Sequence, residues 1–196
     1  MPEKRVIERR NFNVEVRAEG EGRKKIRGHA AVFDRETQIW DFMEVIRRSA
    51  FDEAVETDDV VALWNHNDDL VLGRTKSGTL KLSVDEIGLA IEIDPPDTQW
   101  GRDAVTTIER GDVYQMSFAF DVIDEKWTKR DGMLPLRELL KVKLYDVSPV
   151  TYPAYKDTDV AVRAADHLKE TDAHVPLAGH SADVARNRLA IAERSI

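Results

Sequence analysis

A serine, a histidine and an aspartate stand at positions where they could form a hydrolytic triad. Ser117 lies in the aromatic segment Met-Ser-Phe-Ala-Phe at 116–120, His66 follows an apolar run, and Asp146 precedes a Val-Ser-Pro segment. A serine hydroxyl can attack a carbonyl when a histidine takes its proton and a carboxylate orients that histidine. The chain order His, Ser, acid differs from the three familiar orders of serine hydrolases. Because a triad is defined by geometry, the order excludes nothing.

Strand alternation places the three bulky side chains of the 116–120 segment on one face and Ser117, Ala119 and Asp121 on the other. This pattern predicts a packed face behind Ser117 and open space in front of it for a substrate. The alternative is an ordinary strand serine whose hydroxyl bonds a neighbouring carbonyl. The local pattern alone favours this alternative.

His66 stands where an apolar strand gives way to a polar run that includes Asp68 and Asp69. A histidine titrates near neutral pH and can take and return a proton. Two alternatives are a hydrogen-bonded histidine at a strand end and a metal ligand acting with Asp68 and Asp69. No second histidine lies nearby at ligand spacing, so we expect no metal here.

Asp146 follows Val142 and Leu144 at a spacing of two, so alternation predicts that its side chain points inward with theirs. An inward carboxylate costs several kcal/mol unless it is paired, and an imidazole N–H is a suitable partner. The alternative, which is equally compatible, is a strand-end aspartate satisfied by the backbone turn that follows. Ser148, just before Pro149, is expected to be a turn residue.

The composition is that of one acidic globular domain, with enough residues to add a tail. The chain has 196 residues, a formal net charge of −8 and no cysteine. The charge disfavours general nucleic-acid binding, which needs clustered cations, and the missing cysteines exclude disulfides and thiolate metal sites. No apolar run is long enough to cross a bilayer, and the N-terminus lacks a signal-peptide core. We therefore expect a cytoplasmic protein without a cofactor, a nucleic-acid partner or a membrane partner.

The hydrophobic pattern predicts many strands and few helices, which indicates an α+β barrel or sandwich. Residues 1–163 form the expected catalytic domain, and residues 164–196 form a linker and a helical tail. One expected helix is capped by Ser49, and a second ends at Gly111. The expected strands span 12–18, 26–33, 60–65, 80–84, 89–93, 113–122 and 139–147, the last ended by Pro149.

Several segments, taken in order, resemble the prohead (capsid-maturation) proteases of tailed bacteriophages, which are similar in fold to the herpesvirus assemblin serine proteases. The resemblance covers roughly residues 10 to 160, and the ordered combination is more specific than any one motif. The matching segments are Gly28–Phe33, Arg48–Phe51, Asn65–Asn67, Leu72–Thr75, Gly78–Leu80, Arg110–Val113, Met116–Phe120 and Asp146–Tyr155.

The resemblance implies a mainly antiparallel β-barrel with a few surrounding helices, and it implies roles for three residues. The family's base falls on His66, its nucleophile falls on Ser117, and its acid falls in the segment that begins with Asp146. That acid is commonly a glutamate, so the aspartate is a departure from the family. No motif identifies the donors that would stabilise the oxyanion.

The resemblance further implies a serine endopeptidase that works inside the immature prohead, in the host cytoplasm. Its substrates would be the scaffolding segment of the major capsid protein, or a separate scaffold protein, and the protease itself. A homo-oligomer is expected, and residues 164–196 are a candidate for self-cleavage, for a targeting element or for an ordinary charged helix. The alternative function is an inactive protease-like barrel that acts as a scaffold or assembly protein.

Overall fold

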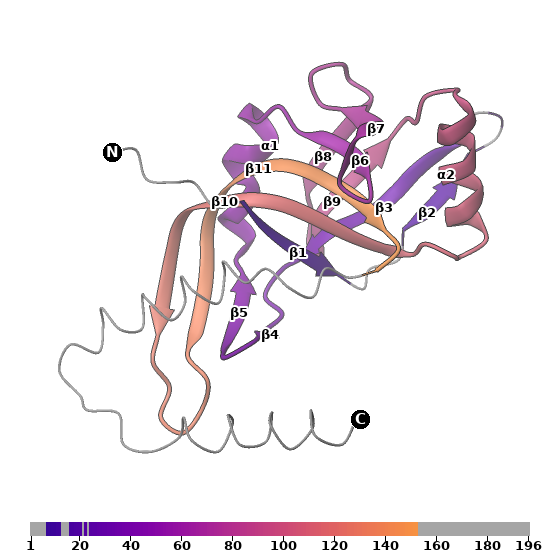
Figure 1. The fold of residues 1–196 in the computed structure, drawn as a ribbon. Helices are drawn as coiled ribbons and strands as arrows, with labels where there is room; N and C mark the ends of the chain where they lie inside the picture. The colour runs from indigo at the N-terminus through magenta and orange to yellow at the C-terminus, as the bar shows by residue number, and fades with distance from the viewer. Residues whose placement is uncertain (1–6, 13–15, 21, 23, 153–196) are drawn as a thin grey trace, which may run out of the picture. The chain divides into compact units, whose positions relative to one another are not determined.

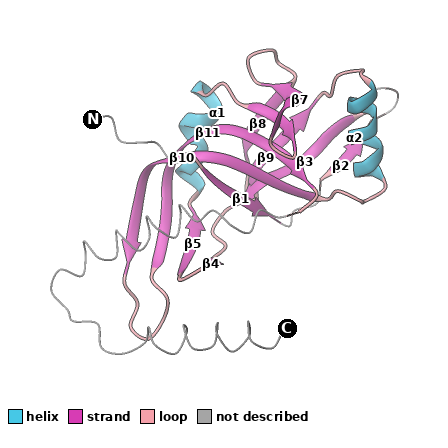
Figure 2. Cartoon of the chain, viewed as in Figure 1, coloured by secondary structure: helices cyan, strands magenta, loops and turns pink. Residues whose placement is uncertain are grey.

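A computed structural model of the chain describes residues 7–12, 16–20, 22 and 24–152. The expected linker and tail at 164–196 lie outside the described residues. Within the described part the protein is mostly β, with two short α-helices (Figure 2). No helix in that part is long and apolar enough to cross a membrane.

The larger sheet has seven strands, and a long ribbon of two antiparallel strands runs through it (Figure 1). The path through this sheet is β1-β10-β11-β5-β4, and β6 pairs with β11 and with β7. The strands β5 and β6 run parallel to β11, so the sheet is mixed. The bounds are β1 Glu8–Phe12, β4 Thr37–Ile39, β5 Phe42–Ile46, β6 Val61–Trp64, β7 Asn67–Arg74, β10 Gln115–Thr128 and β11 Leu136–Val150.

The smaller sheet is antiparallel and has the order β2-β3-β9-β8. Its strands are β2 Arg17–Glu19, β3 Lys25–Val32, β8 Leu80–Val84 and β9 Gly88–Ile93. A 3₁₀ turn at Arg48–Phe51 leads into α1, Asp52–Thr57, and both contact β11. The second helix, α2, spans Gln99–Glu109 and contacts β2.

The expected closed barrel is wrong, because the structure has two separate sheets. No strand pairing joins them among the described residues. The segment expected as one strand over 12–18 is divided between the two sheets. It contains the end of β1, in the larger sheet, and the start of β2, in the smaller one. A period-two pattern that continues across a sheet change cannot be told from one strand by sequence alone.

The strands β8 and β9 and the helix α2 agree with the sequence prediction, and β8 and β9 pair as an antiparallel hairpin. The hydroxyl of Thr98 caps α2 by accepting from the Gly101 N–H, and Gly111 follows the helix with φ of 75°. The predicted cap at Ser49 is wrong, since this residue lies inside the 3₁₀ turn and its hydroxyl bonds the carbonyl of Leu140. Pro149 does not end the last strand, which continues to Val150.

The hydrophobic core lies against the aromatic face of β10. Phe118 is fully buried and contacts the rings of Phe120 at 4.9 Å, Phe51 at 5.4 Å and Phe12 at 6.1 Å between centroids. Full burial of a side chain of this size contributes about 1.5–3 kcal/mol. This packing fixes β10 from behind, as the alternation predicts, and so holds Ser117 in place.

Four charged side chains are buried between β1, β5 and β11, and we call them the ion-pair cluster: Glu8, Arg10, Glu44 and Arg137. Arg10 donates to Glu44 at 2.5 and 2.8 Å and to Glu8 at 2.7 Å. Arg137 donates to Glu8 at 2.8 and 2.9 Å and to Glu44 at 3.1 Å. Each carboxylate thus meets both guanidinium groups, which offsets the cost of burying four charges.

The pKa of Glu8 reflects two opposing effects within the ion-pair cluster, burial and pairing with arginine. Burial alone would raise this pKa, but the hydrogen bonds and charges of Arg137 and Arg10 outweigh burial and hold it below its usual value. Glu8 therefore stabilises the fold while it is ionised. That contribution is present above the unfolded-state pKa and is lost as the pH falls towards the lower folded-state value.

Arg10→Met tests the ion-pair cluster. The variant leaves Glu8 and Glu44 buried with one cation between them, so we expect it to lower the free energy of unfolding by about 3–5 kcal/mol. Urea unfolding measures the change. Arg74→Ala is the matched control, because Arg74 pairs with Asp59 at the surface and its loss should change the midpoint far less. Equal midpoints for Arg10→Met and the unaltered chain would contradict this role.

Candidate active site

His66 lies at the tip of the hairpin formed by β6 and β7. Trp64 pairs with Asn67, so Asn65 and His66 form a two-residue loop, and their φ angles are 54° and 55°. Positive φ at both central residues is the requirement of a type I′ turn, which matches the twist of the flanking strands. Asn and His tolerate this conformation better than most residues with a Cβ. The turn directs the imidazole towards the neighbouring strands.

The side chain and backbone of Asn65 fasten this turn to the end of β11. The Asn65 N–H donates to the carbonyl of Pro149 at 3.0 Å, and the Thr151 N–H donates to Asn65 Oδ1 at 2.9 Å. Asn65 Nδ2 also donates to Thr151 Oγ1 at 3.3 Å. We name Asn65, Pro149 and Thr151 the turn clamp. It fixes the residue next to His66 relative to the strand that carries Asp146.

Ser117 lies on β10, which runs between β1 and β11. In register, Asn11 of β1 and Ser148 of β11 lie directly opposite it, so all three side chains share one face. Ser117 is on the face opposite Phe118, as the alternation predicts. The predicted open space is wrong, because the exposed fraction of Ser117 is 0%. Both faces of β10 are covered here.

Asp146 reaches the same face through an irregularity in β11. Ala119 pairs with Asp146 and Phe120 pairs with Leu144, so Tyr145 is an extra residue between them. Such a bulge reverses the alternation that the sequence implies. Asp146 therefore does not share the face of Leu144, as alternation predicts, but lies on the face of Ser117.

The three residues singled out in the sequence are joined by hydrogen bonds through the imidazole. His66 Nδ1 lies 2.6 Å from Asp146 Oδ1, and His66 Nε2 lies 2.6 Å from Ser117 Oγ. An ionised carboxylate only accepts, so Nδ1 carries the proton and Nε2 accepts from the serine hydroxyl. The side chains of His66 and Asp146 are only 11% and 12% exposed, so water competes little with these bonds.

Ser148 is a further member of this group that the sequence pattern did not identify. Its hydroxyl donates to Asp146 Oδ1 at 2.8 Å and lies 3.3 Å from His66 Nδ1, and the residue is fully buried. It was expected to be a turn residue because Pro149 follows it. It is instead a strand residue paired with Ser117, which no local signal reveals.

The alternative metal site is not assembled. Asp68 and Asp69 are exposed on β7, and both ring nitrogens of His66 face Asp146 and Ser117. Across the residues that the structure describes, no three His, Cys, Asp or Glu side chains are grouped to hold a metal ion. The other described histidine, His29, lies in the smaller sheet and bonds Asp85 at 2.8 Å.

The sequence was compared with models of known protein families, with curated proteins and with solved structures. Residues 12–173 match the family described as Caudovirus prohead serine protease. Neither the curated proteins nor the solved structures compared with the chain gave a match. The match includes His66, Ser117 and Asp146, and it extends over most of the sequence. The chain therefore belongs to the Caudovirus prohead serine protease family, whose members act in capsid maturation.

Proposed function

We propose that this chain is an active serine endopeptidase with Ser117 as nucleophile, His66 as general base and Asp146 as the orienting acid. The observation that supports this most is the imidazole of His66, which lies 2.6 Å from both the hydroxyl and the carboxylate. These separations lie within the range at which a base activates a nucleophile. An inactive scaffold would have no need for this arrangement, so the geometry favours the enzyme.

The reaction follows from the roles of the three groups. His66 Nε2 takes the proton of Ser117 as Oγ attacks the peptide carbonyl, and it then gives that proton to the leaving amine. Asp146 keeps the proton on Nδ1 and stabilises the imidazolium that forms. Water then hydrolyses the acyl-enzyme by the same base. Ser148 holds Asp146 Oδ1 towards the ring, so the shorter aspartate serves where the family commonly has a glutamate.

Substrate access requires a local movement, because the Ser117 side chain is buried in this structure. A closed resting site fits an enzyme whose site opens locally when a peptide binds. We propose that the substrates are the scaffolding segment of the major capsid protein, or a scaffold protein, and the chain itself. The reaction would take place inside the prohead in the host cytoplasm, by a homo-oligomer, with residues 164–196 as a targeting or self-cleaved element.

Ser117→Ala tests the nucleophile. We expect co-expression of the unaltered chain with the major capsid protein of the same phage to yield a shortened capsid protein by mass spectrometry. The variant should leave the capsid protein at full length, because no hydroxyl remains to form the acyl-enzyme. Its urea midpoint should match that of the unaltered chain, which separates loss of chemistry from loss of fold. Normal processing by Ser117→Ala would show that another residue is the nucleophile.

Asp146→Asn tests the orienting acid. An amide at this position can donate to Nδ1 and so favours the wrong tautomer of His66. We expect kcat on a peptide that spans a mapped cleavage site to fall by about 10⁴, with little change in KM. Asp146→Glu restores the carboxylate and should recover part of this loss. An unchanged kcat for Asp146→Asn would remove the residue from the mechanism.

Asn65→Gly tests whether the turn clamp holds the imidazole of His66 in position. Asn65→Gly keeps the positive φ angle but removes both side-chain bonds to Thr151, so His66 should lose its fixed orientation. A hydrogen-bonded clamp contributes about 1 kcal/mol per bond, so we expect kcat/KM to fall about tenfold or more. Thr151→Val removes only the hydroxyl and should cause the smaller loss. Equal activity in all three proteins would show that the turn orients His66 without the clamp.

A further inference from the structure

Arg9 lies on the face of the sheet that carries Ser117. Its neighbours Glu8 and Arg10 belong to the ion-pair cluster and are buried on the opposite face. Successive strand residues point to opposite faces, so the buried pair fixes the direction of Arg9. In register, Arg9 lies directly opposite Ala119, and Ala119 lies two residues from Ser117 on the same face.

Arg9 is an exposed residue, and its guanidinium has no carboxylate partner among the described residues. Most other surface arginines in the described residues are paired, as in Arg74 with Asp59 and Arg130 with Glu36, and Arg35 is a further one without a carboxylate partner. Arg9 differs from Arg35 in its position, because it lies on β1, next to the strand that carries Ser117. A cation left open beside a catalytic strand is available to a ligand.

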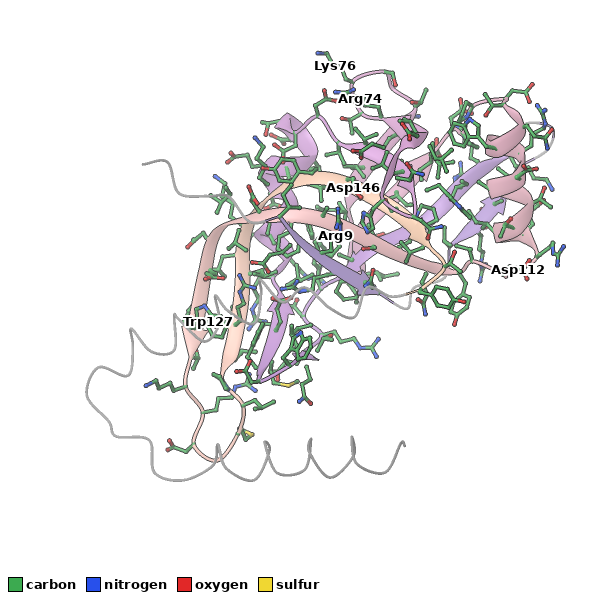
Figure 3. The ribbon with its side chains drawn as sticks, in the orientation of Figure 1. Arg9, Arg74, Lys76, Asp112, Trp127 and Asp146 are labelled. Atoms are coloured by element: carbon green, nitrogen blue, oxygen red, sulfur yellow. The ribbon has the colours of Figure 1, made fainter. Side chains whose placement is uncertain are left out.

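Asp146 does not neutralise Arg9, although both lie in the row of side chains that crosses Ala119. Both are labelled in Figure 3, and their strands lie on either side of β10. Two strand spacings separate them by about 10 Å. Asp146 Oδ1 already accepts from His66 and Ser148. The one side chain between them in the row is the methyl group of Ala119, so the positive charge of Arg9 stays uncompensated.

Arg9 lies close enough to Ser117 to contact substrate side chains next to the cleaved bond. Diagonal neighbours on adjacent strands have side chains about 7–8 Å apart. A peptide whose carbonyl lies at Ser117 Oγ therefore brings the side chains next to that carbonyl within reach of Arg9. The planar guanidinium can bind a carboxylate with two parallel hydrogen bonds.

We propose that Arg9 binds an acidic side chain of the substrate, so that this chain prefers Glu or Asp within two residues of the cleaved bond. The inference rests on the proposed protease function and adds the chemistry of its substrate. The net charge of the chain repels acidic peptides, but beyond about 8 Å salt screens that repulsion. The local charge of Arg9 then decides which side chain is accepted at the site.

Cleavage of a peptide library made from a bacterial proteome, followed by mass spectrometry of the products, tests this proposal. We expect Glu and Asp to be enriched at one position near the cut. Arg9→Ala should lose that enrichment, and its kcat/KM on an acidic peptide should fall about tenfold or more relative to the matched amide peptide. Arg9→Glu should move the preference towards Lys and Arg at the same position.

Arg35→Ala is the matched control, because it removes one exposed arginine from a loop outside β1, β10 and β11. It should keep the acidic preference. The proposal is overturned if Arg9→Ala keeps the preference, or if it slows acidic and amide peptides equally. Cleavage that depends on Ser117 but shows no acidic preference overturns this inference and leaves the protease function standing. Absence of any cleavage by the unaltered chain contradicts the protease function instead.

Discussion

The imidazole of His66 is the group on which the arrangement of the site depends. It bridges a hydroxyl on β10 and a carboxylate on β11, yet it belongs to neither strand. It reaches them from a tight turn with positive φ at Asn65 and His66, a conformation that costs of order 1–3 kcal/mol for a residue with a Cβ. The turn clamp and the bonds to Ser117 and Asp146 offset that cost. Strain at this turn therefore accompanies the precise placement of the imidazole.

The strand β10 separates two environments that serve the site in different ways. Its aromatic face packs into the core, and the neighbouring strand β1 adds the ion-pair cluster on that side. The opposite face carries Ser117 with polar neighbours from β1 and β11. Because the buried charges hold β1 in register, they also determine which β1 side chains lie beside Ser117. The ion-pair cluster on one face of the sheet thus influences which side chains surround Ser117 on the other face.

The strands β8 and β9 and the helix α2 could be predicted because they have strong local patterns. The choice of Ser117, His66 and Asp146 depends instead on the ordered family resemblance, because the local pattern at Ser117 alone favours an ordinary strand serine. The sequence does not reveal that Asp146 reaches the face of Ser117, since a bulge at Tyr145 reverses the alternation. It does not reveal the role of Ser148 or the turn clamp, because both depend on pairing between distant segments. The open sheets also differ from the expected barrel, since strand pattern carries no information on which edges meet. In each case the sequence does not reveal how strands that are distant along the chain pair with one another.

Covalent labelling gives the decisive test of whether His66 activates Ser117. A fluorophosphonate reacts with a serine that an adjacent base activates, and mass spectrometry locates the adduct. We expect one adduct on Ser117 in the folded protein and none in His66→Ala. Labelling at another residue, or undiminished labelling of Ser117 in His66→Ala, would contradict this activation.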